Sequence, residues 1–313
     1  GDENVHLVRC LMDEVFGTNN FIAMVSFQKT GGLSQTFLPV TCDYLLWYAK
    51  DKGIVKSRPL YFQKEFGAGT DYQWVKLKNG EYRRMTSDEM NNPNILPGGA
   101  KPFQTTALES ENPTFNFVHN KKTYVQRWKT NLKGLENLSK AGRLFVATAK
   151  LRYMRFVEDF PVLPFTNVWA DTGSSGYRDP NIYVVQTVAK AIERCLLMTT
   201  DPGDLVLDPT CGSGTTAFVA EKWGRRWITI DTSRVALALA RTRLMAAKYP
   251  YYLLADSPEG IRKEAELTGR MPPDYKTEGD LKKGFVYKRV PHITLKSIAN
   301  NEEIDVIHAR WQE

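Results

Sequence analysis

LVLDPTCGSGTT, residues 205–216, joins a short apolar run to a glycine-rich turn. The apolar residues 205–207 predict a buried strand, and residues 215–223 predict the helix that follows the turn. A second strand is predicted over residues 227–230, and an Ala- and Leu-rich helix over residues 233–247. Strands and helices that alternate in this way predict the α/β class, with a doubly wound and mostly parallel sheet.

The turn in this stretch has the features of a ligand-binding loop. Gly212 and Gly214 allow the backbone to approach a ligand closely, and Asp208 ends a strand where α/β folds bind ligands. A P-loop would need a lysine after Gly214, and an NAD-binding loop would need a third glycine in register; the sequence has neither. S-adenosylmethionine carries a sulfonium cation and no phosphate, which suits a loop beside a carboxylate. We therefore expect this cofactor at Asp208, Pro209, Thr210, Cys211, Gly212, Gly214 and Thr215.

A second carboxylate follows at the spacing expected of a ribose ligand. Asp231 ends the second strand, 23 residues after Asp208. A carboxylate about 20 residues beyond a glycine loop typically accepts hydrogen bonds from ribose hydroxyls. Capping of the next helix is the alternative for Asp231, although Ser233 can serve as that cap. We expect Asp231 and the adjacent Thr232 to belong to the cofactor site.

Composition limits the class of protein. The 313 residues contain no run of about 18 apolar residues, and the polar start of the chain does not resemble a signal peptide, so a cytoplasmic protein without a membrane segment is expected. The four cysteines are scattered, which argues against a disulfide framework and against a metal site. The net charge of +7 is compatible with a nucleic-acid partner.

Basic residues are concentrated before the glycine motif. Residues 57–120 are rich in turn-forming and aromatic residues, which predicts a small folded insert. Residues 121–156 hold ten Lys and Arg with aromatic residues between them. This run is either a solvated helix face or a surface that contacts phosphates, and its aromatic residues either stack on a base or pack the support. The predicted contacts to double-stranded DNA are Lys121, Lys122, Arg127, Lys129 and Arg152.

Together these segments resemble a known family. The glycine motif, followed by ITID at residues 228–231, is similar to the cofactor motifs of DNA methyltransferases that modify adenine N6 or cytosine N4. The resemblance is strongest to the modification subunit of type III restriction–modification systems, through residues 2–17, 151–173 and 183–204. The glycine motif lies after the basic region, which is the order of the β class.

The resemblance implies a structure and an activity. The implied structure is the Rossmann-like fold of S-adenosylmethionine-dependent methyltransferases with an inserted target-recognition region. The implied activity is methyl transfer to an exocyclic amino group of a DNA base, with adenine N6 preferred. Asp171 and Thr172 would also line the cofactor pocket, and the implied partners are a helicase–nuclease restriction subunit and a second copy of the chain. The expected parts are a remaining catalytic half (1–56), a DNA-binding insert (57–160), a cofactor-binding half (161–262) and a charged extension (263–313). Within the extension, residues 285–298 are the only stretch with strand-like character.

The sequence departs from the family at its catalytic motif. This motif is a D/N-P-P-Y/F tetrapeptide that holds the flipped base, and the nearest string here, MPPDY at residues 271–275, has the wrong order. No catalytic residue is therefore assigned, and we expect a fragment of a longer enzyme that lacks a strand beside residues 205–207 and methylates poorly. A non-catalytic DNA-recognition or assembly module is the main alternative, and an RNA methyltransferase is another.

Overall fold

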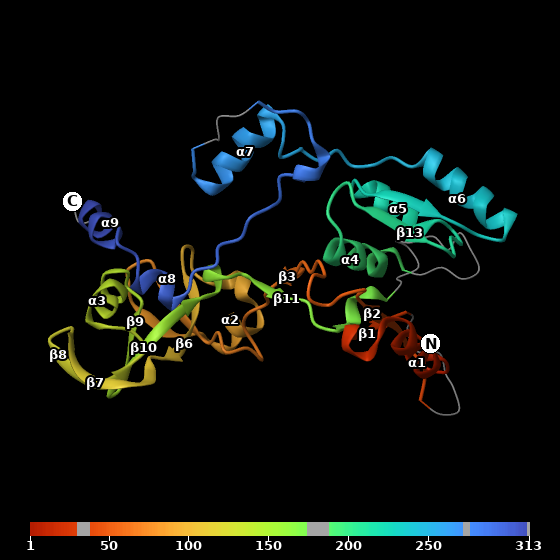
Figure 1. The fold of residues 1–313 in the computed structure, drawn as a ribbon. Helices are drawn as coiled ribbons and strands as arrows, with labels where there is room; N and C mark the ends of the chain where they lie inside the picture. Colours follow the sequence, from red (N-terminus) through yellow and green to blue (C-terminus); the bar gives the residue numbers. More distant parts are fainter. Residues whose placement is uncertain (30–37, 174–187, 272–275, 312–313) are drawn as a thin grey trace. The chain divides into compact units, whose positions relative to one another are not determined.

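The computed structural model describes residues 1–29, 38–173, 188–271 and 276–311, which form two compact units (Figure 1). Unit 1 contains Gly1–Tyr61 and Pro164–Arg289, and unit 2 contains Phe62–Leu163 and Val290–Glu313. The division expected from the sequence set residues 263–313 apart as an extension. In the structure these residues are shared between the units, because those from Val290 onward belong to unit 2.

The first part of unit 1 is a three-stranded sheet with a helix before it. Helix α1 (Val5–Phe16) ends at Gly17, whose φ of 85° is readily adopted by glycine. The sheet has the order β12-β1-β2, with β1 (Phe21–Gln28) parallel to β12 (Val168–Trp169) and antiparallel to β2 (Cys42–Tyr48). Asn4 occupies the N-cap position of α1, and its side chain makes no capping hydrogen bond.

The second part of unit 1 contains the glycine motif. Strands β13 (Leu205–Asp208) and β14 (Arg226–Thr229) pair in parallel, and helix α5 (Thr215–Lys222) connects them. Helix α6 (Arg234–Ala246) follows β14. This strand–helix–strand–helix unit confirms the predicted α/β class. Within the described residues, β13 and β14 form a sheet of two strands, and no strand pairs with the other edge of β13.

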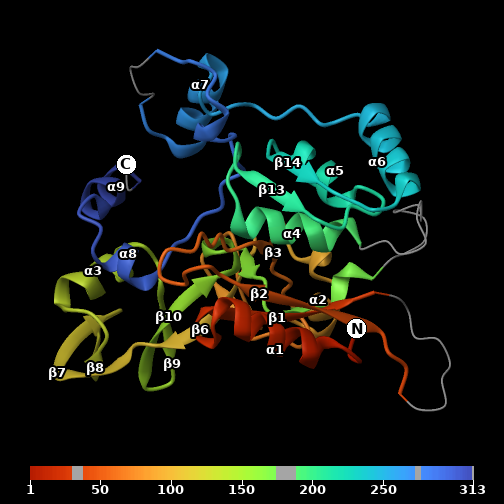
Figure 2. The ribbon, with the colours of Figure 1, turned by 45° about the vertical axis from the view of Figure 1, so that its right-hand side comes forward.

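Helix α4 (Ala189–Thr199) packs against both parts of unit 1 (Figure 2). Its buried Ala191 belongs to the apolar cluster that contains Phe27 of β1 and Trp169 of β12. Five residues further along the helix, Leu196 packs with Val219 of α5 in a second cluster, which includes side chains of β13 and β14. One helix therefore fixes the glycine-motif unit against the first sheet through apolar burial.

The end of unit 1 differs from the expectation of a strand. Helix α7 (Pro258–Thr268) begins at Ser257, whose side chain caps it, and the chain then returns through residues 276–289. Residues 285–298 were predicted to be strand-like, but the only β pairing that they form is an isolated bridge between Phe285 and Leu254. Further along, Thr294 caps helix α8 (Leu295–Ala299) with its side chain. Local capping therefore determines the structure of this segment more than its alternating apolar residues do.

Unit 2 is built on a five-stranded antiparallel sheet. Its order is β5-β4-β6-β10-β9. These strands are β4 (Trp74–Lys76), β5 (Tyr82–Arg84), β6 (Lys101–Ala107), β9 (Leu144–Ala147) and β10 (Lys150–Phe156). The other strands are the hairpin β7 (Glu109–His119) and β8 (Lys122–Trp128), and the pair β3 (Tyr61–Gln63) and β11 (Val162–Pro164), of which Tyr61 and Pro164 are assigned to unit 1. The helices of unit 2 include α2 (Ser87–Asn91), α3 (Leu132–Lys140), α8 and α9 (Ile304–Arg310).

The largest core cluster of unit 2 includes residues of helices α8 and α9. Trp128 of β8 and Leu135 of α3 are fully buried, and Ile298 of α8 packs in the same cluster. Asn137 of α3 donates a hydrogen bond from Nδ2 to the carbonyl oxygen of Ala299, over 2.9 Å. Helix α8 is thus part of this core, and the residues before it are held at the surface of unit 2.

A buried carboxylate in unit 2 makes the stability of the chain depend on pH. Glu89 accepts two hydrogen bonds from the Arg83 guanidinium, each of 2.7 Å, and one of 2.9 Å from the backbone N–H of Thr86. The bonds from Arg83 are the largest cause that lowers the pKa of Glu89 to about 2. Because the pKa of Glu in an unfolded chain is about 4.3, this contribution is complete above that pH and is lost as the pH falls toward 2.

We expect Glu89→Gln to lower the free energy of unfolding by about 1–2 kcal/mol at pH 7, a range that allows for the partial exposure of Arg83. Urea unfolding at pH 7, 5, 4 and 3 should show that the difference from the unaltered chain shrinks below about pH 4. Glu158→Gln, which removes an exposed partner of Lys101, is the control and should have little effect. A difference for Glu89→Gln that is the same at every pH would contradict the explanation.

Candidate functional site

The carboxyl ends of β13 and β14 are tied together at the glycine loop. The backbone N–H of Ile230 donates to the carbonyl oxygen of Asp208 over 2.9 Å, and the N–H of Cys211 donates to the carbonyl of Ile230 over 2.8 Å. These bonds extend the parallel pairing beyond the strands. They bring the loop after β13 beside the residues that follow β14, as expected at the ligand-binding edge of an α/β sheet.

Asp231 joins the two loops directly. Its Oδ2 accepts a hydrogen bond of 2.8 Å from the backbone N–H of Gly212, and its Oδ1 accepts one of 2.8 Å from the N–H of Ser233. The backbone donors of Ser233 and Gly212 lower the pKa of Asp231, so the side chain is ionised at neutral pH. A carboxylate has about four lone-pair sites, so acceptor capacity remains after the bonds from the backbone of Ser233, Gly212 and Thr232. Asp231 can therefore hold the loop and still accept hydrogen bonds from a ligand.

The helix cap after Asp231 is supplied by Ser233. Its Oγ accepts a hydrogen bond of 3.3 Å from the backbone N–H of Ala236, at the start of α6. The sequence left the roles of Asp231 and Ser233 open. In the structure Ser233 caps the helix, and Asp231 bridges from Ser233 to Gly212.

Gly214 allows helix α6 to pack closely against the loop. Its φ is 74°, and a Cβ atom at this position would lie 2.8 Å from the Cβ of Ala240. Gly214 is also the N-cap residue of α5, and it has no side chain with which to cap the first N–H groups of that helix. These donors and the positive end of the helix dipole suit an anionic group beside the loop.

The glycine motif has a buried side and an accessible side. Cys211 and Thr215 are buried, whereas Asp208 is half-buried and Pro209, Thr210 and Thr232 are exposed. The Cys211 and Thr215 side chains, which we predicted to bind cofactor, therefore face the protein interior. Their remaining contribution to binding would come from the backbone.

Arg243 of α6 is a part of the site that was not predicted. Its Nη1 donates to the Thr215 hydroxyl over 3.0 Å and to the carbonyl oxygen of Ser213 over 3.3 Å. The guanidinium also lies 4.8 Å from the centre of the Phe218 ring. Arg243 thus holds the inner side of the loop against α6, and only the tertiary structure shows that these segments meet.

Asp171 and Thr172 occupy a different setting from the glycine loop. The Asp171 carboxylate pairs with Arg194 and with Lys190, both on α4, and the bonds from Arg194 are the largest cause that lowers its pKa. The Thr172 hydroxyl is buried and donates to the carbonyl oxygens of Gln28 and Trp169, each over 2.9 Å. These contacts hold the end of the first sheet against α4. A cofactor contact for either residue stays a prediction.

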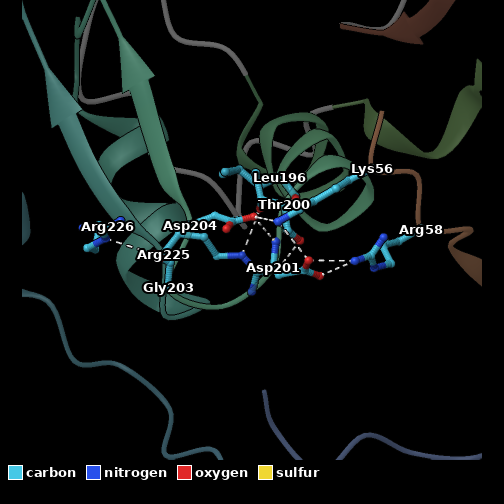
Figure 3. A network of polar contacts seen from close by, with 9 residues as sticks. All are labelled: Lys56, Arg58, Leu196, Thr200, Asp201, Gly203, Asp204, Arg225 and Arg226. Atoms are coloured by element: carbon cyan, nitrogen blue, oxygen red, sulfur yellow. Dashed lines mark hydrogen bonds and ion pairs between the residues drawn. The ribbon is translucent and has the colours of Figure 1, made fainter. Parts of the chain in front are cut away.

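A polar network fixes the other end of β13 (Figure 3). Buried Arg225 donates to the Thr200 hydroxyl over 3.0 Å and to the carbonyl oxygens of Thr200 and Trp223 over 2.7 and 2.6 Å. Asp204 accepts from the N–H of Asp201 and pairs with Lys56, while Asp201 pairs with Arg58. The network attaches the residues around 56–58 to the start of β13, which positions the strand that carries the loop.

The predicted DNA-contacting residues all lie in unit 2. Exposed Lys121 and Lys122 are at the turn of the β7–β8 hairpin, Arg127 and Lys129 are exposed at the end of β8, and half-buried Arg152 is on β10. None of the five forms an ion pair with a residue that the structure describes. By contrast, Lys133 and Lys140 both pair with Asp305, Lys150 with Glu109, and Arg143 with Asp159. The five predicted cations therefore lack a direct ion pair in the described chain, although Arg152 lies close enough to Glu109 to contribute to the lowered pKa of that carboxyl.

The aromatic residues of the basic region are buried. Tyr124, Trp128, Tyr153 and Phe156 are between 0 and 7% exposed and pack in the cores of unit 2. Of the two roles left open for them, this arrangement supports packing of the surface and not stacking on a base. The burial alternates along β8, with Arg127 exposed between buried Gln126 and Trp128.

Two kinds of feature are absent from the described residues. No group of three or more His, Cys, Asp or Glu side chains among them lies close enough together to hold a metal ion. No helix in the same ranges has the length and apolar character needed to cross a membrane.

Curated relatives of the chain carry the name type II methyltransferase. The type II methyltransferase M.EcaI of Enterobacter cloacae is 25% identical over 261 residues, which cover 80% of this chain and 53% of that protein. The type II methyltransferase M2.DpnII of Streptococcus pneumoniae is 51% identical over 55 residues, which cover 18% of this chain and 20% of that protein. The chain thus spans about half or less of these relatives. Their names indicate type II systems, so the closer resemblance to a type III subunit stays a prediction.

Solved structures of DNA methylases also match, at low similarity. The M1.HpyAVI–SAM complex is 19% identical with a TM-score of 0.23, and the match covers 45% of this chain and 63% of that one. The putative DNA modification methylase TTHA0409 from Thermus thermophilus, complexed with S-adenosyl-L-methionine, is 17% identical with a TM-score of 0.21 and coverages of 46% and 69%. Scores of this size do not establish a shared arrangement of the whole chain.

The family assignment rests on a match to most of the sequence. The N6_N4_Mtase family, described as DNA methylase, matches residues 1–242 of the 313. This range includes the glycine motif, Asp231 and the basic region. The chain therefore belongs to the DNA methylase family.

Proposed function

We propose that this chain supplies the S-adenosylmethionine-binding part and the DNA-binding part of a DNA methyltransferase. The observation that carries the proposal is the Asp231 bridge. An ionised carboxylate holds the glycine loop by the Gly212 N–H and the following loop by the Ser233 N–H, and it keeps free acceptor sites. Membership of the DNA methylase family supports the same function.

The residues around the loop fit the chemistry of the cofactor. Asp231 would accept hydrogen bonds from the ribose hydroxyls. The N–H groups at the start of α5 have no side-chain cap at Gly214, and they suit the carboxylate of the methionine part of the cofactor. The Asp208 carboxylate suits the positive charge of the cofactor. When bound, S-adenosylmethionine would supply a methyl group activated by the sulfonium. The role of the chain is to bind and orient, because productive methyl transfer requires close alignment of the reacting atoms.

The acceptor and the partners follow from the family resemblance. We propose that the methyl acceptor is an exocyclic amino group of a DNA base, adenine N6 in preference to cytosine N4. We also propose that the protein acts in a restriction–modification system. Its candidate partners are a helicase–nuclease subunit and a second copy of the chain. The sequence has no D/N-P-P-Y/F tetrapeptide, so no residue is assigned to hold the target amino group. This favours the second candidate function, a non-catalytic DNA-recognition or assembly module that retains the fold.

A panel of ligands tests the proposed cofactor class. Thermal unfolding of the chain should be measured with S-adenosylmethionine, S-adenosylhomocysteine, ATP and NAD, each at the same concentration. We expect the first two to raise the unfolding temperature and the two phosphate-bearing nucleotides to leave it unchanged, because ligands that bind the native state stabilise it. Stabilisation by ATP or NAD alone would contradict the proposal.

Unpaired basic residues of unit 2 should bind DNA more strongly than paired ones. We expect Arg127→Ala to weaken binding to a short DNA duplex by about 3- to 10-fold at low salt. The slope of log binding constant against log salt concentration should become shallower by about one, because one fewer counterion is released. Lys133→Ala also removes one positive charge, but this lysine already pairs with Asp305. We therefore expect this variant to change DNA binding little. Fluorescence anisotropy over a range of salt concentrations measures both. Equal losses for the two variants would show that only net charge matters, and preference for duplex RNA would favour the RNA alternative.

A further inference from the structure

A cavity within unit 2 is lined by residues from both of the sequence segments that form this unit. Its volume is about 470 Å³. Strands β6 and β10 contribute Thr106, Tyr153 and Arg155, and Lys129 follows strand β8. The remaining side includes residues 292–296, which lead into α8. The cavity is separate from the glycine loop, which belongs to unit 1.

The cavity is positively charged and has no acidic lining residue. Lys129, Arg155 and Lys296 are among its ten lining residues together with His292, and none of the ten is Asp or Glu. These three cations form no ion pair with the residues that the structure describes. Converging cations without counter-charges create a positive potential that attracts an anion. Lys133 and Lys140, in the same unit, are instead neutralised by Asp305.

Tyr153 adds a hydrogen-bonding group without a partner. Its side chain lines the cavity and is 3% exposed, and its hydroxyl has no hydrogen-bond partner among the described residues. Buried polar atoms are normally paired, so an orphan of this kind calls for an explanation. Burial raises the pKa of Tyr153, which keeps the hydroxyl protonated and able to donate to an anionic oxygen.

We propose that this cavity holds a phosphodiester group of double-stranded DNA, with Lys129, Arg155 and Lys296 as cationic contacts and the Tyr153 hydroxyl as a neutral donor. Lysine and arginine bind phosphate oxygens, and such contacts position a protein on the duplex. The inference rests on the proposed function, because DNA is the source of the phosphate. It adds the segment 292–296 to the DNA-contacting surface, outside the basic region at residues 121–156.

Binding of a short DNA duplex by the full chain tests this inference. Fluorescence anisotropy should be recorded over a range of KCl concentrations for the unaltered chain and for Lys296→Ala, Tyr153→Phe and Lys140→Ala. We expect Lys296→Ala to weaken binding by about 3- to 10-fold and to reduce the salt slope by about one. Tyr153→Phe should weaken binding by about 2- to 5-fold without changing the slope, because it removes no charge. Lys140→Ala is the matched control, since Lys133 remains to pair with Asp305, and it should resemble the unaltered chain.

The other outcomes overturn the inference. If Lys296→Ala and Tyr153→Phe bind the duplex as tightly as the unaltered chain does, the cavity takes no DNA phosphate, and the proposed function is unaffected. If both variants lose binding of inorganic phosphate while duplex binding is unchanged, the cavity takes a free phosphate. If the unaltered chain binds no duplex, this inference and the DNA part of the proposed function both fail, and the ligand panel then tests the cofactor part separately.

Discussion

Asp231→Ala is expected to weaken binding of S-adenosylmethionine by at least about a hundredfold, equivalent to about 2.7 kcal/mol. The substitution removes the acceptor of the Gly212 N–H and of the Ser233 N–H, so the glycine loop loses its attachment to the loop after β14. It also removes the proposed acceptor of the ribose hydroxyls. Hydrogen bonds to a charged group contribute about 1.5–3 kcal/mol each, so the expected loss is of this size. Isothermal titration calorimetry measures it.

Asp51→Ala provides a matched control for Asp231→Ala. Asp51 is exposed, and its carboxylate also accepts a backbone hydrogen bond, of 2.8 Å from the Gly53 N–H, at a site outside the glycine loop. Both variants remove one carboxylate and one local turn contact, but only Asp231 lies at the proposed site. We expect cofactor affinity in Asp51→Ala to match that of the unaltered chain. An Asp231→Ala chain that is folded and binds with full affinity would place the cofactor elsewhere.

Gly214→Ala is expected to lower the free energy of unfolding by about 2–4 kcal/mol and to reduce cofactor binding. The left-handed conformation at φ 74° costs a residue with a Cβ about 1–2 kcal/mol. The new Cβ would also lie 2.8 Å from the Cβ of Ala240, so that α6 must shift. Overpacking of this kind typically costs about 1–3 kcal/mol. Urea unfolding gives the stability, and calorimetric titration gives the affinity.

Gly269→Ala separates the two contributions. Gly269 has a similar φ of 65° at the end of α7, but a Cβ there would have no atom within 4 Å. This variant should show the conformational cost alone, about 1–2 kcal/mol, with no loss of cofactor affinity. The explanation based on the close approach of α6 requires Gly214→Ala to be clearly the more destabilising substitution. Equal destabilisation by the two would contradict it.

Local sequence patterns predicted the glycine-motif unit closely. The strand predicted over residues 205–207 is β13, the helix predicted over 215–223 is α5, and the helix predicted over 233–247 is α6, each within a residue of the observed bounds. The predicted burial of the strand was wrong, because Leu205 and Leu207 are 52 and 61% exposed. These elements are determined by short-range features: a compact apolar run, a glycine turn and a serine cap. Asp231 was predicted to belong to the same site as the glycine loop, and the structure brings the two together because the strand ends lie next to each other in a parallel pair.

Contacts between distant segments could not be predicted in this way. Arg243 lies 28 positions after Thr215, yet it binds the Thr215 hydroxyl, and Arg194 holds Asp171 from a different helix. The strand-like residues 285–298 form no strand, because Thr294 caps a helix whose apolar face completes the core of unit 2. In each case the partner is supplied by tertiary packing, which overrides local propensity.

Titration of S-adenosylmethionine into this chain by isothermal calorimetry tests the central claim most directly. The Asp231 bridge and the uncapped start of α5 predict a single saturable site per chain, and circular dichroism should establish that the sample is folded. A folded chain that gives no saturable heat, and whose unfolding temperature does not rise with the cofactor, would contradict the claim that the glycine loop binds S-adenosylmethionine.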